Sequence, residues 1–337
     1  MEVQQTSVKR GIREAAANPC RHLMRRVVLL LWLSVAVFAQ KGAPLSAQKV
    51  LWLGDSITAA GDYVSIAEYY LNRQYTASHF DFVSIGLSSE TVSCLSENDH
   101  PFPRPCLSER LQRALTAVHP QVVVACYGMN DGIYHPQSPE RMAAFQKGVQ
   151  DLITAVRAAN ARLILLSPTV FDPVSLTATL PADAPDYSYK APYEKYDDVL
   201  ADYAAWEKTL AAADVTVVDL HTPMSDYVAA QRSEDPKFTF AKDGIHPDFA
   251  GHLLMAQTLL KAVRVNVPKT PLAEEAERVR ADPLYVLVKA HREKRTAGWL
   301  NYVGYTRDKT VKTENADAEE KASQDLQFQV DLMRGTK

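Results

Sequence analysis

The sequence predicts a three-layer α/β/α fold in which a five-stranded parallel sheet is covered by helices on both faces. Two observations lead to this fold class. Five short apolar segments, rich in β-branched residues, each have the length of a buried strand, and amphipathic segments with helical periodicity alternate with them. The chain of 337 residues, 47% of them apolar, is long enough to bury a large core. Its composition excludes a disordered, collagen-like or coiled-coil protein.

The first 47 residues have the pattern of a secretory signal peptide. Basic residues dominate positions 1–26, and an apolar run at 27–39 follows them directly. This run of about thirteen residues is shorter than the roughly 20 that a helix needs to span a bilayer, which favours a cleaved leader over a membrane anchor. Small residues offer cleavage sites after Ala39 and Ala47. We therefore expect an exported protein, secreted or periplasmic, without a stable membrane span after cleavage.

The charge balance changes once this leader is removed. The whole chain has 37 basic and 40 acidic residues, and loss of residues 1–47 leaves 30 against 38, a net charge of −8. No long Lys/Arg run occurs outside the N-terminus, so the sequence lacks the basic surface of a nucleic-acid-binding protein. Translation starts at Met1 or at Met24, and the sequence does not distinguish the two.

Export also changes how the cysteines are interpreted, because disulfides persist in oxidising compartments. Cys94 and Cys106 flank a proline-rich loop and have a spacing that fits a small disulfide ring. Cys126 ends an apolar segment and is expected to be a buried free thiol, whereas Cys20 leaves with the leader. The usual motifs of zinc hydrolases, P-loop enzymes and dinucleotide-binding enzymes do not occur, so we expect no metal or cofactor.

The predicted strands and helices follow one another along residues 49–263. The strands are expected at 49–53, 80–85, 121–126, 162–166 and 215–220. The helices are expected at 63–75, 107–118, 138–160, 196–213 and 249–263, the last with leucines on one stripe. In such a parallel sheet, ligands bind beyond the carboxyl ends of the strands, so functional residues should follow strands directly.

The first candidate site residue is Ser56, which follows the first strand in the motif Gly54-Asp55-Ser56. Glycine permits a tight turn at the strand end, and a serine on the next turn presents its hydroxyl and N–H at the edge of the sheet. This arrangement is typical of a nucleophile. The alternative is an N-cap serine that opens the next helix.

The second and third strands end in further candidates. Gly86 follows the second strand, where the lack of a side chain lets a backbone N–H approach a substrate; a plain loop glycine is the alternative. The third strand runs into a turn that contains Asn130, whose carboxamide then lies at the same edge of the sheet. The alternative is that Asn130 only stabilises the turn, because asparagine is a common turn residue.

Asp243 and His246 lie between the fifth strand and the last helix. A carboxylate three residues before an imidazole, on a turn tightened by Gly244, is placed to bond Nδ1–H and to leave Nε2 free to take a proton. The alternative is an Asp/His loop that caps the helix. A rival pair, Asp219 and His221, is expected to be structural, because one-residue spacing on a strand points two side chains apart.

These four motifs follow different strands of one sheet and together supply each role that acyl transfer needs. In order and spacing they resemble the SGNH, or GDSL, hydrolase family over about residues 49–263. One departure is Ser84, because many members have Asn two residues before the glycine that corresponds to Gly86. The resemblance implies a flavodoxin-like fold, with residues 48–265 as the hydrolase domain.

The resemblance also implies a serine esterase that works through an acyl-Ser56 intermediate. Ser56 would attack the ester carbonyl, His246 would take and later return the proton, and Asp243 would hold the imidazole in the right tautomer. The N–H groups of Ser56 and Gly86 and the side-chain amide of Asn130 would bind the oxyanion. No metal would be required.

The substrate is indicated less directly. Tyr187, Tyr189 and Tyr193, among prolines and aspartates after the fourth strand, either form an aromatic platform for a sugar ring or only pack their long loop. Export, an acidic chain and no lipid-like apolar insert favour an O-acetyl esterase with a glycan or small-molecule ester as substrate. A lysophospholipase or thioesterase is the second interpretation, and an inactive carbohydrate-binding protein is the third.

Residues 266–337 are predicted to form a helical extension. Prolines interrupt the beginning of this segment, and basic and acidic residues alternate in its tail. Its one apolar and aromatic cluster, at 299–305, either docks on the hydrolase domain, which we favour, or contacts a partner. The sequence does not indicate an oligomeric state.

Overall fold

Residues 43–307, 309–310 and 316–335 are described by a computed structural model of the chain. The leader predicted over residues 1–47, including the alternative start at Met24, therefore lies almost entirely outside the described residues. Within the described ranges, no helix has both the length and the apolar character that crossing a membrane requires.

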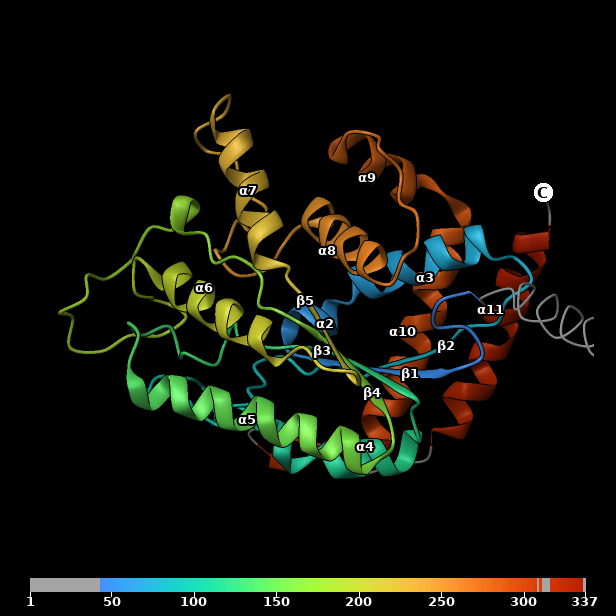
Figure 1. Ribbon diagram of the computed structural model, residues 1–337, viewed down its shortest axis with the longest axis horizontal. Coiled ribbons are helices and arrows are strands. Elements are labelled where there is room, and N and C mark those ends of the chain that lie inside the picture. The colour runs from blue at the N-terminus through green and yellow to red at the C-terminus, as the bar shows by residue number, and fades with distance from the viewer. Residues whose placement is uncertain (1–42, 308, 311–315, 336–337) are drawn as a thin grey trace, which may run out of the picture. The chain divides into compact units, whose positions relative to one another are not determined.

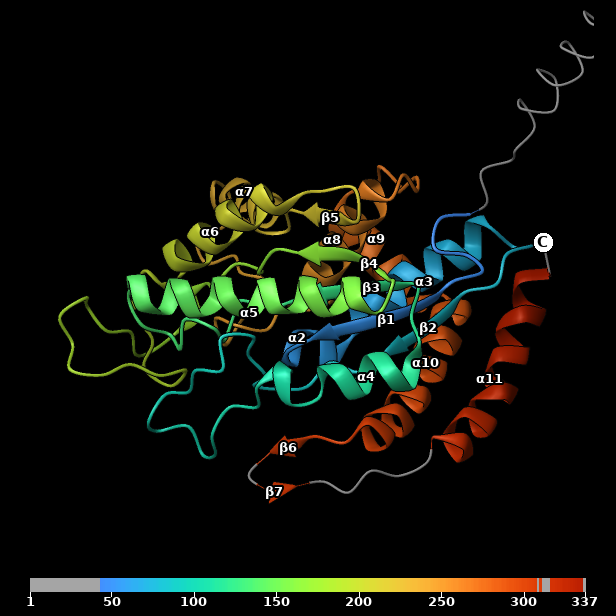
Figure 2. The same ribbon diagram turned by 60° about the horizontal axis from the view of Figure 1, so that its bottom comes forward.

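Five parallel strands form the central sheet (Figure 1), and their order is β2-β1-β3-β4-β5 (Figure 2). In this sheet Leu51 lies opposite Val83 on one side and Val123 on the other. Every residue of β3 is buried, as expected where helices cover both faces. The predicted fold class is confirmed. The strands are β1 Lys49–Gly54, β2 Asp81–Ser84, β3 Val122–Cys126, β4 Arg162–Leu166 and β5 Val215–Val218.

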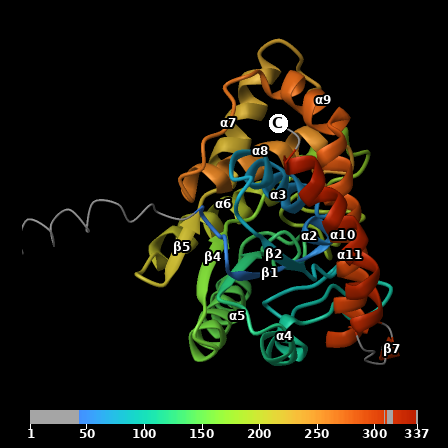
Figure 3. The ribbon, with the colours of Figure 1, turned by 90° about the vertical axis from the view of Figure 1, so that its right-hand side faces the viewer.

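Helices cover both faces of the sheet, as Figure 3 shows: α3 and α8 lie on one face and α4 and α5 on the other. α6 packs beside α5 through the stacked rings of Phe145 and Tyr203, whose centroids are 4.0 Å apart. Figure 2 shows α5 running along the sheet. These helices are α3 Asp62–Gln74, α4 Leu111–Val118, α5 Pro139–Ala158, α6 Tyr196–Glu207 and α8 Phe249–Ala262.

Several elements differ from the sequence prediction. The segment predicted as a helix at 107–118 begins with a separate 3₁₀ turn, Leu107–Glu109, and the helix predicted at 196–213 ends at Glu207, before a 3₁₀ turn at Lys208–Leu210. The fifth strand ends at Val218 rather than at residue 220. Asp219 causes this early end, because its carboxylate accepts the N–H of Thr222 at 3.0 Å and turns the chain into a helix that we did not predict, α7 (His221–Arg232).

The C-terminal extension consists mainly of helices and packs on the α/β part of the chain. α10 contacts α3 and the edge strand β2, where Arg295 Nη1 donates to the main-chain oxygen of Phe82 at 2.8 Å. Trp299, from the apolar cluster at 299–305, is 8% exposed and donates to Glu320 on α11. The extension contains α9 Leu272–Ala281, α10 Pro283–Val303, a short β6 Thr306–Arg307 and β7 Lys309–Thr310, and α11 Asp317–Gly335.

Candidate active site

Ser56 is the first residue of a short helix, α2 (Ser56–Ala60), that begins directly after β1. The turn between the two needs glycine, because a Cβ on Gly54 would lie 2.0 Å from Thr58 Oγ1. Asp55 is the N-cap, and its carboxylate accepts the N–H of Ile57 at 2.9 Å. Asp55, rather than Ser56, therefore caps the helix, so the serine hydroxyl remains available for another partner.

That partner is His246. Its Nε2 lies 2.7 Å from Ser56 Oγ, and its Nδ1 lies 2.6 Å from Asp243 Oδ2. The carboxylate of Asp243 also accepts the main-chain N–H groups of Ile245 and His246, at 3.0 and 2.8 Å, which fixes it within the loop. The structure thus brings together three residues that the sequence predicted as a set, from two segments far apart in the chain.

The charges in this set favour proton transfer from Ser56. Burial raises the pKa of Asp243, but hydrogen bonds from the His246 ring and from two main-chain N–H groups outweigh it and hold the pKa well below its usual range. The hydrogen bond to this carboxylate in turn raises the pKa of His246 above its ordinary value. Asp243 is therefore ionised, and it stabilises the protonated imidazole.

Asn130 lies in the turn after β3, and its side-chain amide is held in one orientation. Its Oδ1 accepts the hydroxyl of Tyr134 at 3.0 Å, and its Nδ2 donates to the main-chain oxygen of Glu90 at 3.3 Å. An amide nitrogen carries two hydrogens, so one bond leaves a second N–H for a ligand. The carboxylate of Glu90 is buried and paired with Arg110 at 2.6 Å, which fixes the segment beneath Asn130.

Gly86 lies against the backbone of α2, where a Cβ would come within 2.3 Å of the main-chain nitrogen of Ala59. The flanking N–H groups of Ile85 and Leu87 donate to Trp52 and Gly54, respectively, both on β1. Successive N–H groups of an extended chain point in opposite directions, so the N–H of Gly86 points away from β1.

Two buried carboxyls lie close to the reacting groups. Burial raises the pKa of Asp55 to about 7, against the opposing hydrogen bond from Ile57. Burial also raises the pKa of Asp131 to about 6, although this carboxylate accepts main-chain N–H groups of Val92, Ser93 and Gly128. Asp131 thereby ties the turn that holds Asn130 to the chain segment leading to Cys94.

A pocket of about 330 Å³ opens at Ser56. Asn130 and His246 line it with Ser56, whereas Gly86 does not. Most of the other lining residues are polar or aromatic, and sequence analysis identified only Tyr189 among them. They are Ser88, Ser89, His100, Pro101, Phe102, Arg104, Tyr134, Tyr189 and Ile245.

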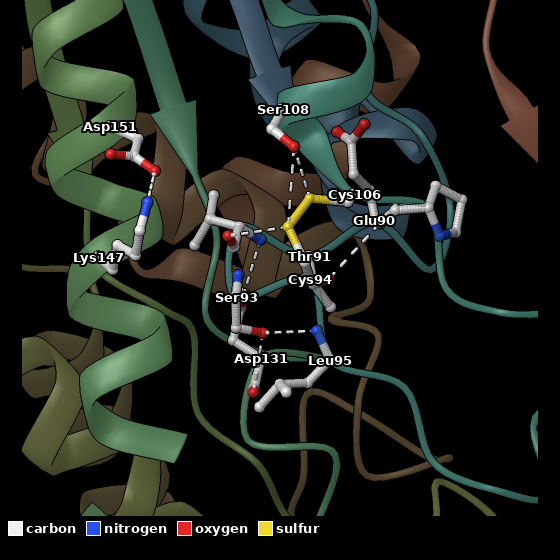
Figure 4. Close-up of a disulfide and its surroundings, with 12 residues drawn as sticks. Glu90, Thr91, Ser93, Cys94, Leu95, Cys106, Ser108, Asp131, Lys147 and Asp151 are labelled. Atoms are coloured by element: carbon white, nitrogen blue, oxygen red, sulfur yellow. Dashed lines mark hydrogen bonds and ion pairs between the residues drawn. A yellow bond between two sulfur atoms is a disulfide. The ribbon is translucent and has the colours of Figure 1, made fainter. Parts of the chain in front are cut away.

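Much of this lining comes from the loop between Cys94 and Cys106, whose sulfur atoms are joined in a disulfide (Figure 4). The two Cα atoms are 4.7 Å apart. Within the loop, the buried guanidinium of Arg104 forms two hydrogen bonds with Glu97, at 2.5 and 2.6 Å. The disulfide and this ion pair together fix the loop against the pocket. Proline and cysteine spacing suggested the ring but did not reveal which of its side chains face Ser56.

The three tyrosines proposed as a platform lie in different environments. Only Tyr189 lines the pocket, with its ring 5.6 Å from that of His100. Tyr187 is buried and donates its hydroxyl to the main-chain oxygen of Pro181 at 2.7 Å, and its ring packs on that of Tyr193. Tyr187 and Tyr193 thus hold the loop together, which was the alternative we considered.

The rival pair is separated. Asp219 bonds Lys208 Nζ at 2.9 Å, whereas His221 Nε2 lies 3.2 Å from Asp197. The strand argument for this pair was wrong, because both residues lie beyond β5, but the two side chains do have separate partners. Across the described part of the chain, no group of three or more His, Cys, Asp or Glu side chains has the geometry to hold a metal ion.

A sequence model of the GDSL-like lipase/acylhydrolase family matches residues 52–254, which run from β1 into α8 and include Ser56, Asn130 and His246. The chain belongs to this family. This GDSL-like hydrolase is therefore a carboxylic ester hydrolase, and its substrates are esters. A search of curated protein sequences finds no match.

Solved structures resemble this GDSL-like hydrolase. A variant of an acetyl-xylooligosaccharide esterase from Geobacillus stearothermophilus is 19% identical, with a TM-score of 0.50, over 68% of this chain and 100% of that one. A gut microbial diltiazem-metabolising enzyme is 22% identical, with a TM-score of 0.48, over 65% of this chain and 47% of that enzyme. The GDSL-like hydrolase thus spans about half the length of the second protein. At 19% identity, the likeness to the acetyl-xylooligosaccharide esterase concerns the fold alone.

Proposed function

We propose that this hydrolase is an exported serine esterase that removes O-acetyl groups from carbohydrate, with Ser56 as its nucleophile. The observation that carries the catalytic part is the continuous hydrogen-bonded series from Ser56 Oγ through His246 to Asp243, with distances of 2.7 and 2.6 Å. This series ends in a pocket large enough for an ester. This arrangement supports the roles of nucleophile for Ser56, base for His246 and orienting group for Asp243.

In the proposed mechanism, Ser56 Oγ attacks the ester carbonyl while His246 Nε2 takes the hydroxyl proton. The ionised Asp243 stabilises the imidazolium that forms and keeps Nδ1 protonated. The carbonyl carbon becomes tetrahedral, and His246 then gives its proton to the departing alcohol, which leaves an acyl-Ser56 ester. Water, activated by His246 in the same way, releases the acid and restores the serine.

The negative oxygen of the tetrahedral intermediate needs hydrogen-bond donors. We assign this role to the N–H groups of Ser56 and Gly86 and to the second Nδ2 hydrogen of Asn130. The bonds from Asn130 to Tyr134 and Glu90 support this assignment, because they hold the amide before charge develops. A donor that is already oriented costs no reorganisation in the transition state.

The lining of the pocket supports a small acyl group and a polar alcohol. A volume of about 330 Å³, shared between the acyl group and the alcohol, is at the lower end of the range for ligand pockets. Its lining includes Ser88, Ser89 and Arg104, which favour a hydroxylated substrate over a lipid chain. The aromatic rings of His100 and Tyr189 both line the pocket, which supports contact with a sugar ring.

The proposal is tested with chromogenic esters from acetyl to octanoyl and with acetylated oligosaccharides. We expect kcat/KM to fall as the acyl chain lengthens and acetate to be released from the glycan. Ser56→Ala should abolish hydrolysis without changing the unfolding midpoint by more than a few degrees, and a phosphonate should label Ser56 in the unmodified protein. Activity that rises with chain length would favour a lysophospholipase or thioesterase instead. Binding of glycan without acetate release would favour the inactive binding protein.

Export is tested separately, by N-terminal sequencing of the protein recovered from its native compartment. The basic segment followed by a short apolar run supports removal of the leader at Ala39 or Ala47. The Cys94–Cys106 disulfide supports an oxidising compartment. A mature chain that begins at Met1 or Met24 and remains inside the cell would contradict this part of the proposal.

A further inference from the structure

The helix that carries Ser56 is too short to hold its own position. α2 has five residues, whereas isolated helices shorter than about 12 residues are marginal in water. Its backbone rests on Gly86 on one side, as the contact with Ala59 shows. The last carbonyl groups of a helix lack intrahelical partners, so the end of α2 at Ala60 needs a donor from elsewhere.

That donor comes from α10, in the C-terminal extension. Tyr285, Lys289 and Arg292 are spaced by four and three residues and therefore lie on one face of this helix. We call these three residues the α10 clamp. All three contact the junction between α2 and α3.

Arg292 makes the central contact of the clamp. Its Nη2 donates to the main-chain oxygen of Ala60 at 3.0 Å, and its Nε donates to Ser65 Oγ on α3 at 2.7 Å. One planar guanidinium thus joins the end of α2 to the first turns of α3. An ammonium group has no such planar fork and cannot reproduce both bonds in this geometry.

The junction is built to fit this side chain. Gly61 has a φ of +70°, and a Cβ there would lie 2.3 Å from Arg292 Nη1. Arg292 itself is 3% exposed. The other two clamp residues fix the next position, because Tyr285 Oη and Lys289 Nζ donate to Asp62 Oδ1 at 2.9 and 2.7 Å.

We propose that Arg292 is a positioning residue, which acts through α2 to hold Ser56 at hydrogen-bonding distance from His246. This inference rests on the proposed role of Ser56 as the nucleophile. Arg292 lies outside residues 52–254, which match the family, so the extension supplies part of the support for the reacting groups. Its contribution is to kcat rather than to substrate binding, because the pocket contains no clamp residue.

The expected size of the effect follows from geometry. At 1.5 Å per residue, Ala60 is only about 6 Å along the axis from Ser56, so movement at one end of α2 reaches the other. A misplacement of about 1 Å in a reacting group lowers rates by up to roughly 100-fold. We therefore expect Arg292→Met to lower kcat roughly 10- to 100-fold and to change KM less than about 2-fold.

The experiment compares Arg292→Met and Arg292→Lys with Arg295→Met in the full-length protein. Arg295 is the matched control, because it is also buried on α10 but donates to Phe82 and Asp81 at the edge of the sheet rather than to α2. Each variant is measured for kcat and KM on an acetyl ester, for the rate of phosphonate labelling at Ser56, and for the midpoint of urea unfolding.

The proposal predicts that Arg292→Met lowers kcat and the rate of phosphonate labelling by the same factor. Arg292→Lys should give values between those of Arg292→Met and the unmodified protein. Arg295→Met should lower the unfolding midpoint and leave kcat within about 2-fold of the unmodified protein. Equal losses of kcat in Arg292→Met and Arg295→Met would overturn the proposal, as would an unchanged labelling rate in Arg292→Met.

Ser65→Ala keeps the proposal testable if Arg292→Met does not fold, since it removes one of the two bonds from Arg292 to the α2–α3 junction and leaves the charge of Arg292. It should lower kcat roughly 3-fold, and an unchanged kcat would also overturn the proposal. The Ser56→Ala variant distinguishes failure of the proposed function from failure of this inference about Arg292. If Ser56→Ala retains hydrolysis, the nucleophile has been assigned wrongly, whatever the Arg292 variants show.

Discussion

The reacting groups and the pocket lining that faces the substrate are held in place by different kinds of structure. Ser56 and Asn130 directly follow strands of the sheet, and the loop of His246 is fixed by main-chain hydrogen bonds to Asp243. The facing side of the pocket, which we call the pocket wall, consists of His100, Phe102, Arg104 and Tyr189. These four residues lie on two loops with little regular secondary structure. The sheet therefore positions the reacting groups, whereas a disulfide and an ion pair position side chains that would contact the substrate.

Among variants that keep Ser56, the largest effect should come from Asp243→Asn, which preserves shape but removes the charge that orients His246. We expect kcat to fall by on the order of 10³ to 10⁴ with little change in KM. The pH profile supplies an independent measurement. His246 must be neutral to act as a base, so kcat/KM should fall as pH drops through its raised pKa, above about 6.5. In Asp243→Asn this acidic limb should move to lower pH; a limb that stays in place would contradict the assigned pair.

Asn130→Ala should have the next largest effect. It removes a donor whose bond strengthens only as charge develops, so kcat should fall roughly 100-fold, with little change in KM. Asn130→Asp should be worse, because a carboxylate repels the oxyanion. The acidic limb due to His246 should remain in both variants. If Asn130→Ala instead raised KM and left kcat unchanged, Asn130 would act in substrate binding, as we expect of the pocket wall.

Reduction of the disulfide should act mainly on the pocket wall. Without the Cys94–Cys106 bond, substrate binding must order His100 and Phe102, at about 0.5–1.5 kcal/mol for each side chain. We expect KM to rise roughly 10-fold in the double variant Cys94→Ser/Cys106→Ser, and kcat to change less than about 3-fold. Kinetics with and without dithiothreitol on the unmodified protein provide the matched control. A fall in kcat alone would show that the loop supports the chemistry instead.

Tyr189→Ala should have the smallest effect. It tests whether Tyr189 contacts the substrate while Tyr187 and Tyr193 only hold their loop together. Its ring lines the pocket, so KM for a glycan ester should rise roughly 3-fold while the KM of a simple acetyl ester stays the same. Tyr187→Phe is the control, because it removes only the hydroxyl that bonds Pro181, outside the pocket. It should lower the unfolding free energy by about 1 kcal/mol and leave KM unchanged. Equal changes in KM would contradict this separation.

The parts that the sequence predicted well are those with a regular pattern. Buried strands with turn motifs at their ends reveal both the sheet and the residues at its edge, since consecutive parallel strands share that edge. Ser56 and His246 were predicted together for this reason. The pocket wall has no such pattern. Arg104 faces the pocket because the disulfide and Glu97 fix its loop, and neither contact has a periodic signature.

The helices of the extension show a second limit. α10 contacts α3, α9, α11 and β2 through buried residues that recur every three or four positions and form one stripe along the helix. They include charged groups such as Arg292 and Arg295, which a hydropathy pattern assigns to solvent. The hydrogen bonds to Ser65 and Ala60, more than 200 positions earlier, help to make Arg292 compatible with burial, and no local pattern reveals them.

The long separation of Ser56 and His246 determines when, during synthesis, the enzyme becomes active. The two residues are 190 positions apart, so a ribosome that adds roughly 5–20 residues per second needs about 10–40 s to pass from the nucleophile to its base. The contact from Arg292 to Ala60 spans 232 positions and forms later still. A nascent chain therefore carries an unactivated serine until His246 has been synthesised, and the contact of Arg292 with Ala60 cannot form before residue 292.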